Sequence, residues 1–189
     1  GQEWENEAAK RGLSNHKATP AALKANISKK AITLFGNLEI LTKTEIDARY
    51  DIQLEEYVLR IQIEGRVLGD IARNHVIPTA IKYQNILIEN VKGLKDIFGN
   101  DFKKVAKDQL VLIESISEHI GKISQGIDEM TNARKKANEI ESHEERAAAY
   151  CDLVKPYFET IRYHCDKLEL LVDDEIWPLT KYRELLFTR

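Results

Sequence analysis

The chain has 189 residues, enough for one hydrophobic core of ordinary size or two small ones. Hydrophobic residues make up 43% and charged residues 31%, which is typical of a soluble, helix-rich domain rather than a disordered chain. The formal charge of −3 provides no global field to attract nucleic acid or an anionic membrane. Two cysteines exclude a disulfide-rich scaffold, and nine glycines with four prolines are few for a β-sandwich or barrel.

The hydropathy and the first residues of the chain indicate its cellular location and its origin in a longer protein. No apolar run approaches the roughly 20 residues that a membrane span needs, and the polar start is not a signal peptide. We therefore expect a cytoplasmic protein. The chain begins with Gly1 and contains a single methionine, Met130, whereas an intact translation product normally begins with Met. We expect a domain excised from a longer protein.

The first part of the chain is polar and interrupted by turn-forming residues. We predict an irregular, partly helical lead over residues 1–26 and a helical bundle domain over residues 27–189. In the lead, Thr19 before Pro20 is typical of an N-cap followed by proline in the first helical turn. Ser28 is expected to cap a second short helix.

The first long helix is predicted to begin near Thr42, because Thr42 and Glu45 match the T-x-x-E capping box. Its apolar residues recur in steps of three and four, at Leu54, Val58, Ile61, Gly65, Leu68, Ala72 and His75. Residues 60–64 alternate as a strand would, but the helical period extends much further. Pro78 should kink or interrupt this helix. The pattern resumes at Ala80, Gln84, Leu87, Val91, Leu94 and Phe98.

The next helix has the most regular pattern in the chain, with alternating steps of three and four typical of a coiled-coil seam. The seam consists of Ile113, Ile116, Ile120, Ile123, Ile127, Met130, Arg134 and Ala137. Gly121 and Gly126 each weaken a helix by roughly 1 kcal/mol relative to alanine. We therefore expect packing against neighbouring elements to hold this helix.

The last long helix shows the same spacing over a wider apolar stripe, which is typical of a bundle helix. The stripe consists of Ala147, Tyr150, Val154, Tyr157, Ile161, His164, Leu168 and Leu171, flanked by Cys151, Phe158, Cys165 and Val172. Pro156 should bend this helix, and Trp177 with Pro178 should end it. We predict an all-α, up-and-down bundle of about three long helices, one interrupted near Pro78, with short helices in the N-terminal lead.

A bundle of long helices suggests a ferritin-like di-iron site, which requires Glu-x-x-His on two helices. None of the five histidines has a glutamate three residues before it. His75 and His164 lie on apolar stripes and are interpreted as hydrogen-bonded core residues. Cys151 and Cys165 are separated by about 21 Å along one predicted helix, beyond disulfide reach, and are interpreted as small core residues.

Three other patterns have structural interpretations that we favour over functional ones. Residues 121–124 resemble a phosphate loop only faintly, because the first glycine is missing and the segment lies within a helix. Gly65 and Gly69, one turn apart, indicate close helix–helix approach rather than a ligand site. The basic clusters at 103–104 and 134–136 lack interleaved aromatic residues, which favours solvated faces over nucleic-acid sites.

Three carboxylates, Asp173, Asp174 and Glu175, crowd the end of the last helix, where the helix dipole disfavours negative charge. We expect a salt bridge to Lys181 or Arg183, or to a partner, in preference to catalysis or ligand binding. No matched acid–base companion lies nearby in sequence. The sequence therefore predicts no catalytic, cofactor-binding or metal-binding residue.

Several stretches, spread along essentially the whole chain, are similar to those of one known family. They are residues 10–15 with 19–20 and 22–23, 61–70, 74–80, 83–85, 87–94, 133–138, 154–158 and, most specifically, 171–178 with 181–187. These stretches resemble the type III glutamine synthetases. In that family this region is the C-terminal part of a much longer ligase.

The resemblance implies a parent enzyme that joins glutamate and ammonia into glutamine through γ-glutamyl phosphate. ATP and Mg or Mn are expected in its catalytic portion, upstream of this chain, and no cofactor is expected in this part. None of the catalytic motifs can be matched here, so no site residue is carried over. The implied role is structural, in homo-oligomeric rings with other subunits of the same enzyme, without nucleic-acid or membrane partners.

Two alternatives differ in class from a piece of a ligase. A stand-alone helical module could bind another protein through its seam, and a native species of about 21.7 kDa would favour it. A metal-dependent bundle enzyme would need the absent Glu-x-x-His motif. A separate hypothesis concerns the apolar tail residues Tyr182, Leu185, Leu186 and Phe187, which we expect to dock onto the bundle itself or onto the catalytic portion.

Overall fold

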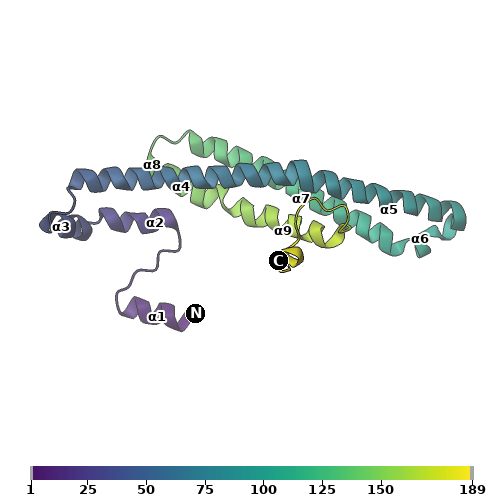
Figure 1. Ribbon diagram of the computed structural model, residues 1–189, viewed down its shortest axis with the longest axis horizontal. Helices are drawn as coiled ribbons and strands as arrows, with labels where there is room; N and C mark the ends of the chain where they lie inside the picture. Colours follow the sequence, from purple (N-terminus) through teal and green to yellow (C-terminus); the bar gives the residue numbers. More distant parts are fainter. Residues whose placement is uncertain (1, 188–189) are drawn as a thin grey trace. The chain divides into compact units, whose positions relative to one another are not determined.

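The computed structural model describes residues 2–187, and within them it contains helices and no strand (Figure 1). The predicted all-α class is confirmed. Contacts divide the described residues into two units, which are treated separately below. Unit 1 comprises the residues up to Ile63 together with Arg134–Val154, and unit 2 comprises Glu64–Ala133 and the residues from Lys155 onward. The predicted boundary at residue 26 lies inside unit 1 and stays a prediction.

Ten α-helices account for most of the described chain. They are α1 (Gln2–Lys10), α2 (Thr19–Leu23), α3 (Lys29–Asn37), α4 (Lys43–Ile71), α5 (Ile77–Phe98), α6 (Phe102–Val105), α7 (Lys107–Asn138), α8 (His143–Ala149), α9 (Pro156–Leu171) and α10 (Tyr182–Leu185). Two π-helical turns, Ala72–Val76 and Tyr150–Val154, precede α5 and α9. None of the described helices combines the length and apolarity needed to cross a bilayer.

Local capping explains where the helices of unit 1 begin. The Ser28 hydroxyl accepts a hydrogen bond from the Ala31 N–H at 3.2 Å, as predicted. The capping box also forms, because Glu45 accepts from the Thr42 N–H at 2.7 Å and the Thr42 hydroxyl accepts from the Glu45 N–H at 3.3 Å. The predicted N-cap at Thr19 is wrong: extended Ala18 precedes α2, so Thr19 already belongs to the helix.

The interruption predicted near Pro78 is confirmed, and it takes the form of a π turn. Pro78 lies in the first turn of α5, directly after the π turn Ala72–Val76. The wider π turn moves the position that faces the core from His75 to Val76. His75 is consequently exposed and Val76 is buried, so the prediction of a core His75 is wrong.

The same arrangement of a π turn before a proline occurs at α9. Pro156 lies in the first turn of α9, and the π turn Tyr150–Val154 precedes it. The predicted bend at Pro156 is therefore an interruption of the helix. The stripe on both sides of it is buried, at Tyr150, Val154, Ile161 and Leu168. Gly99, at a φ of +56°, ends α5, and Phe98 before it is exposed rather than part of the stripe.

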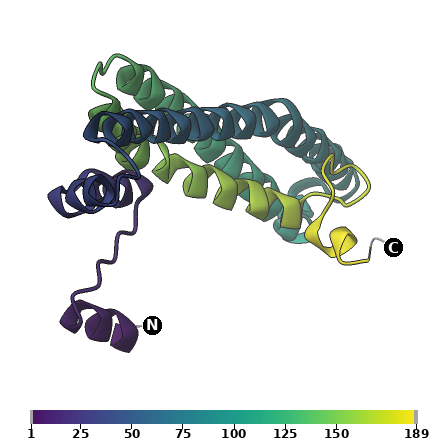
Figure 2. The ribbon, with the colours of Figure 1, turned by 60° about the vertical axis from the view of Figure 1, so that its left-hand side comes forward.

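The seam of α7 is confirmed: none of its eight residues is exposed, and Ile116, Ile123, Ile127, Met130 and Ala137 are buried. Glycines let other helices of unit 2 come close. A Cβ on Gly65 would lie 3.2 Å from Phe158 Cε1, and a Cβ on Gly126 would lie 3.0 Å from Ile161 Cγ1. Figure 2 shows α9, in yellow-green, running along α7. The predicted close approach at Gly65 is thus confirmed.

Candidate functional site

The acidic cluster after α9 is tied to a lysine, as predicted. The Lys181 ammonium forms an ion pair with Asp174 and donates a hydrogen bond to the Glu169 carbonyl at 2.8 Å. It also lies 5.8 Å from the centroid of the Trp177 ring. The carboxylate of Asp173 accepts the Glu175 N–H at 2.9 Å and so stabilises the turn. These contacts give the cluster a structural role within unit 2.

The last described apolar side chains of the tail are largely exposed. Leu186 and Phe187 are 63% and 78% exposed, and Leu185 is also exposed. The side chains of Tyr182 and Arg183 lie outside the described part of the chain, and with them the predicted contacts of these two residues. Docking of the tail onto the catalytic portion stays a hypothesis.

His164 is a half-buried, hydrogen-bonded histidine, as predicted. Its Nδ1 lies 2.9 Å from Nδ1 of His119, so one ring must donate and the other accept. Burial lowers the pKa of His164, and the neighbouring His119 and Lys122 lower it further. Among residues 2–187, no group of three or more His, Cys, Asp or Glu could hold a metal ion.

The remaining motifs have the structural positions that the sequence indicated. Cys151 and Cys165 are unpaired and half-buried, and burial raises the pKa of Cys165 to about 11. Such a thiol stays protonated and unreactive at neutral pH. Residues 121–124 lie inside α7 and offer no loop for phosphates. The lysines at 103–104 and 135–136 are exposed, as the interpretation of solvated faces requires, whereas Arg134 of the second cluster is half-buried.

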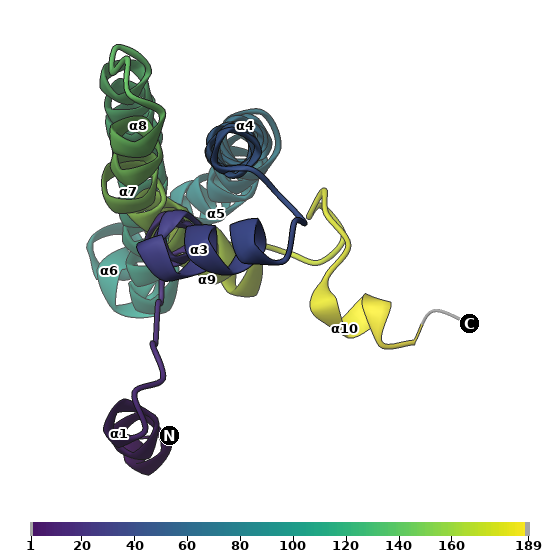
Figure 3. The same cartoon turned by 90° about the vertical axis from the view of Figure 1, so that its left-hand side faces the viewer.

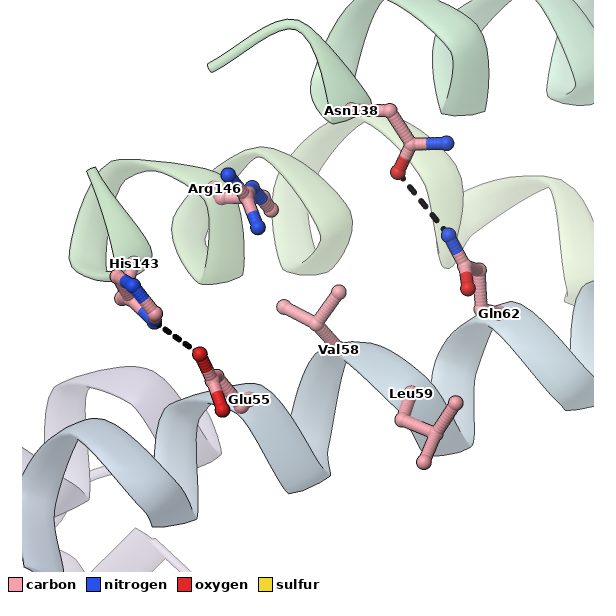
Figure 4. A pocket seen from close by; sticks show the side chains of 7 residues that line it. All are labelled: Glu55, Val58, Leu59, Gln62, Asn138, His143 and Arg146. Carbon is pink, nitrogen blue, oxygen red and sulfur yellow. Dashed lines mark hydrogen bonds and ion pairs between the residues drawn. The ribbon is translucent and has the colours of Figure 1, made fainter. Parts of the chain in front are cut away.

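Unit 1 contains two cavities that the sequence did not predict. The first, here the α4–α8 cavity, has a volume of about 180 Å³ (Figure 4). Its lining consists of Glu55, Val58, Leu59, Gln62, Asn138, His143 and Arg146. In Figure 3 α4 is seen end-on, and α8 lies to one side of it.

One side of the α4–α8 cavity is a hydrogen-bonded network of two amides and a phenol. Gln62 Nε2 donates to Asn138 Oδ1 at 3.0 Å and to the Tyr150 hydroxyl at 2.8 Å. The Tyr150 hydroxyl in turn donates to Asn138 Oδ1 at 2.6 Å. Because Tyr150 is fully buried, these bonds satisfy a hydroxyl that would otherwise lose its partner on folding.

The other side of the cavity carries charges of both signs. The Glu55 carboxylate lies 3.0 Å from His143 Nδ1. Arg146 donates through Nε to the Ile140 carbonyl at 2.8 Å and through Nη2 to the Glu141 carbonyl at 3.4 Å. Within residues 2–187 no carboxylate oxygen lies within ion-pair distance of its guanidinium. Arg146 thus holds the α7–α8 connection while its charge stays unneutralised.

The second cavity, of about 520 Å³, lies between the lead and α8 and has paired charges. Its lining consists of His16, Ala18, Pro20, Ala21, Lys24, Glu144, Glu145, Ala148, Cys151 and Asp152. Lys24 Nζ lies 2.5 Å from Glu144, which also accepts from the Tyr50 hydroxyl at 3.1 Å. These hydrogen bonds lower the pKa of Glu144, while burial raises the pKa of Tyr50 to about 12.

Comparison with known proteins decides the family of the chain. The family model described as "Glutamine synthetase C-terminal domain" matches residues 1–95, half of the chain. The chain belongs to this family. The resemblance to type III glutamine synthetases is thereby confirmed at the level of the C-terminal domain.

Three relatives extend the similarity over the rest of this glutamine synthetase C-terminal domain. The "Glutamine synthetase" of Bacteroides fragilis (strain YCH46) is 44% identical over 189 residues, 100% of this chain and 26% of its own length. The "Type-3 glutamine synthetase" of Dictyostelium discoideum is 28% identical over 99% of this chain, and the "Glutamine synthetase" of Butyrivibrio fibrisolvens 29% over 98%. The chain spans about a quarter of the length of these relatives.

Proposed function

We propose that this chain is the structural and assembly region of a type III glutamine synthetase, a ligase that makes glutamine from glutamate, ammonia and ATP through γ-glutamyl phosphate. The whole enzyme serves glutamine biosynthesis in the nitrogen metabolism of the cytoplasm. ATP and Mg or Mn bind in the portion outside this chain. The observation that carries the proposal is the match along the entire chain to proteins named glutamine synthetase, of which it spans about a quarter.

An unpartnered apolar face on α4 supports the assembly role. Ile52, Leu59 and Ile63 are separated by seven and four residues, so they share one face of the helix. Each is more than half exposed, whereas a surface helix normally turns polar residues to solvent. We propose that this face, the α4 apolar face, contacts a neighbouring subunit in a homo-oligomeric ring.

The test uses the full-length enzyme. Leu59→Lys together with Ile63→Lys should reduce the oligomer to smaller species in analytical ultracentrifugation, because two charges would have to be buried at the contact. Glu56→Lys is the matched control on the same helix, and it should leave the oligomer intact. An unchanged mass for the double variant would contradict the assembly role. A native protein of about 21.7 kDa would favour a stand-alone interaction module instead.

The proposal also predicts that the 189-residue chain alone is catalytically inactive. Incubation with glutamate, ammonia, ATP and magnesium should release no phosphate above background, because the catalytic portion is expected outside this chain. Measurable glutamine formation would contradict this part of the proposal.

A further inference from the structure

The α4–α8 cavity holds the Glu55 carboxylate, which lies 3.0 Å from His143 Nδ1, and the Arg146 guanidinium, which has no carboxylate partner among the described residues. Glu55 projects into it from α4, and Arg146 faces it from α8 (Figure 4). No ion pair joins the two within the described residues, although both line the same small space. The second cavity of the same unit differs, since Lys24 and Glu144 pair directly there. Arg146 is half-buried and lacks a carboxylate partner, so its guanidinium is a favourable binding site for a negatively charged group.

The chemistry of the lining limits what could bind. A phosphate or other polyanion would be repelled by Glu55, and a polyamine by Arg146. A molecule that carries one negative and one positive group would satisfy both. Val58 adds an aliphatic wall against which methylene groups could pack. Gln62 keeps its amide oxygen as a free acceptor among the described residues.

The size of the cavity further limits the class of ligand that could bind. Its volume of about 180 Å³ corresponds to about six water molecules, at roughly 30 Å³ each. This lies below the roughly 300–1,000 Å³ of sites for drug-sized ligands. It suits a small metabolite with two charged groups.

We propose that the α4–α8 cavity binds a free α-amino acid as its zwitterion. The Arg146 guanidinium receives the carboxylate, and the Glu55 carboxylate, whose Oε1 lies 3.0 Å from His143 Nδ1, receives the ammonium group through its other oxygen. The aliphatic wall contacts the side-chain methylenes. This site lies where α8 meets the α7–α8 connection, which Arg146 already holds through two carbonyls. The proposal does not depend on the assembly role, because binding is measured on the chain itself.

The first experiment titrates L-glutamine into the 189-residue chain by isothermal calorimetry. Two derivatives serve as matched probes: N-acetyl-L-glutamine lacks the ammonium charge, and L-glutamine methyl ester lacks the carboxylate. We expect saturable binding of one L-glutamine per chain, with each derivative weaker because it loses one of the two charged contacts. Loss of the carboxylate should cost about tenfold, since hydrogen bonds to a charged group are strong.

The second experiment assigns the contacts to residues. Glu55→Gln should weaken L-glutamine about threefold, since an exposed ion pair contributes little, and should leave the N-acetyl derivative unaffected. Arg146→Lys keeps the positive charge near Ile140 but removes the planar fork, and should weaken L-glutamine about tenfold while leaving the methyl ester unaffected. Circular dichroism verifies that both variants are folded.

The controls are Glu56→Gln and Arg60→Lys, which alter an ion pair on α4 outside the cavity. Glu56 is a close match for Glu55, since the two side chains are 59% and 58% exposed. Both controls should bind L-glutamine as the unchanged chain does. The proposal is overturned if no saturable heat appears at millimolar L-glutamine. It is also overturned if both derivatives bind equally well, or if the controls weaken binding as much as the cavity variants.

Discussion

The contact between Gly126 and Ile161 offers a direct test of how closely α7 and α9 pack within unit 2. A Cβ added at Gly126 would lie 3.0 Å from Cγ1 of Ile161, which is fully buried and cannot swing into solvent. Gly121 lies five residues earlier on the same helix, and a Cβ there would meet nothing within 4 Å. The two glycines therefore share a backbone environment and differ in packing.

The expected magnitudes follow from two opposing effects. Replacement of glycine by alanine in a helix interior stabilises by about 1 kcal/mol. Overpacking a close contact costs about 1–3 kcal/mol, because the neighbours must shift. Gly121→Ala should therefore gain about 1 kcal/mol of unfolding free energy, whereas Gly126→Ala should lose up to about 2 kcal/mol.

Urea unfolding followed by far-ultraviolet circular dichroism measures both variants against the unchanged chain. The slope with denaturant should stay constant, so that the midpoints report stability directly. If Gly126→Ala stabilises as much as Gly121→Ala, α7 and α9 do not pack as closely as the structure indicates, and the reasoning is refuted.

Three further expectations can be checked with the same unfolding assay. Because burial lowers the pKa of His164 below 6.5, the unfolded state binds more protons just below that pH. Stability should therefore fall as the pH drops through 6.5, and less steeply in His164→Asn. Ile123→Asp should cost more than about 3 kcal/mol, whereas Val111→Asp, exposed on the same helix, should change stability by less than about 0.5 kcal/mol. Thr42→Ala should cost about 1 kcal/mol by removing the capping hydroxyl, and equal stability would show that the box contributes nothing.

The helices and their buried faces could be predicted because the apolar period is long and regular. Leu54 and Ile116 are fully buried where the spacing places them. His75 could not be placed correctly by the same spacing. Pro78 predicts an interruption, but the sequence does not specify whether the backbone adopts a kink, a break or a π turn there. The π turn decides which neighbouring residue faces the core.

The α4–α8 cavity could not be predicted, because its walls come from segments that are far apart in the chain. Gln62 and Asn138 meet across 76 residues, and only tertiary packing brings them together. One signal was present: a tyrosine on an apolar stripe, Tyr150, needs a hydrogen-bond partner when buried. That requirement predicts a polar neighbour without identifying it. The Lys181 contact was easier to predict, because the acidic cluster lies only a few residues away.

The π turn at Ala72–Val76 also bears on how this region tolerates changes in length. A π turn accommodates one residue more than an α-helical turn does, while the helix on either side keeps its buried face. Loss of one residue here would convert the segment to regular α-helix and leave Ala72 and Ala80 both directed inward. The same deletion within α4 would rotate every later residue by about 100° and turn Ile61 away from the core. Single-residue gaps among related sequences should therefore concentrate at this turn.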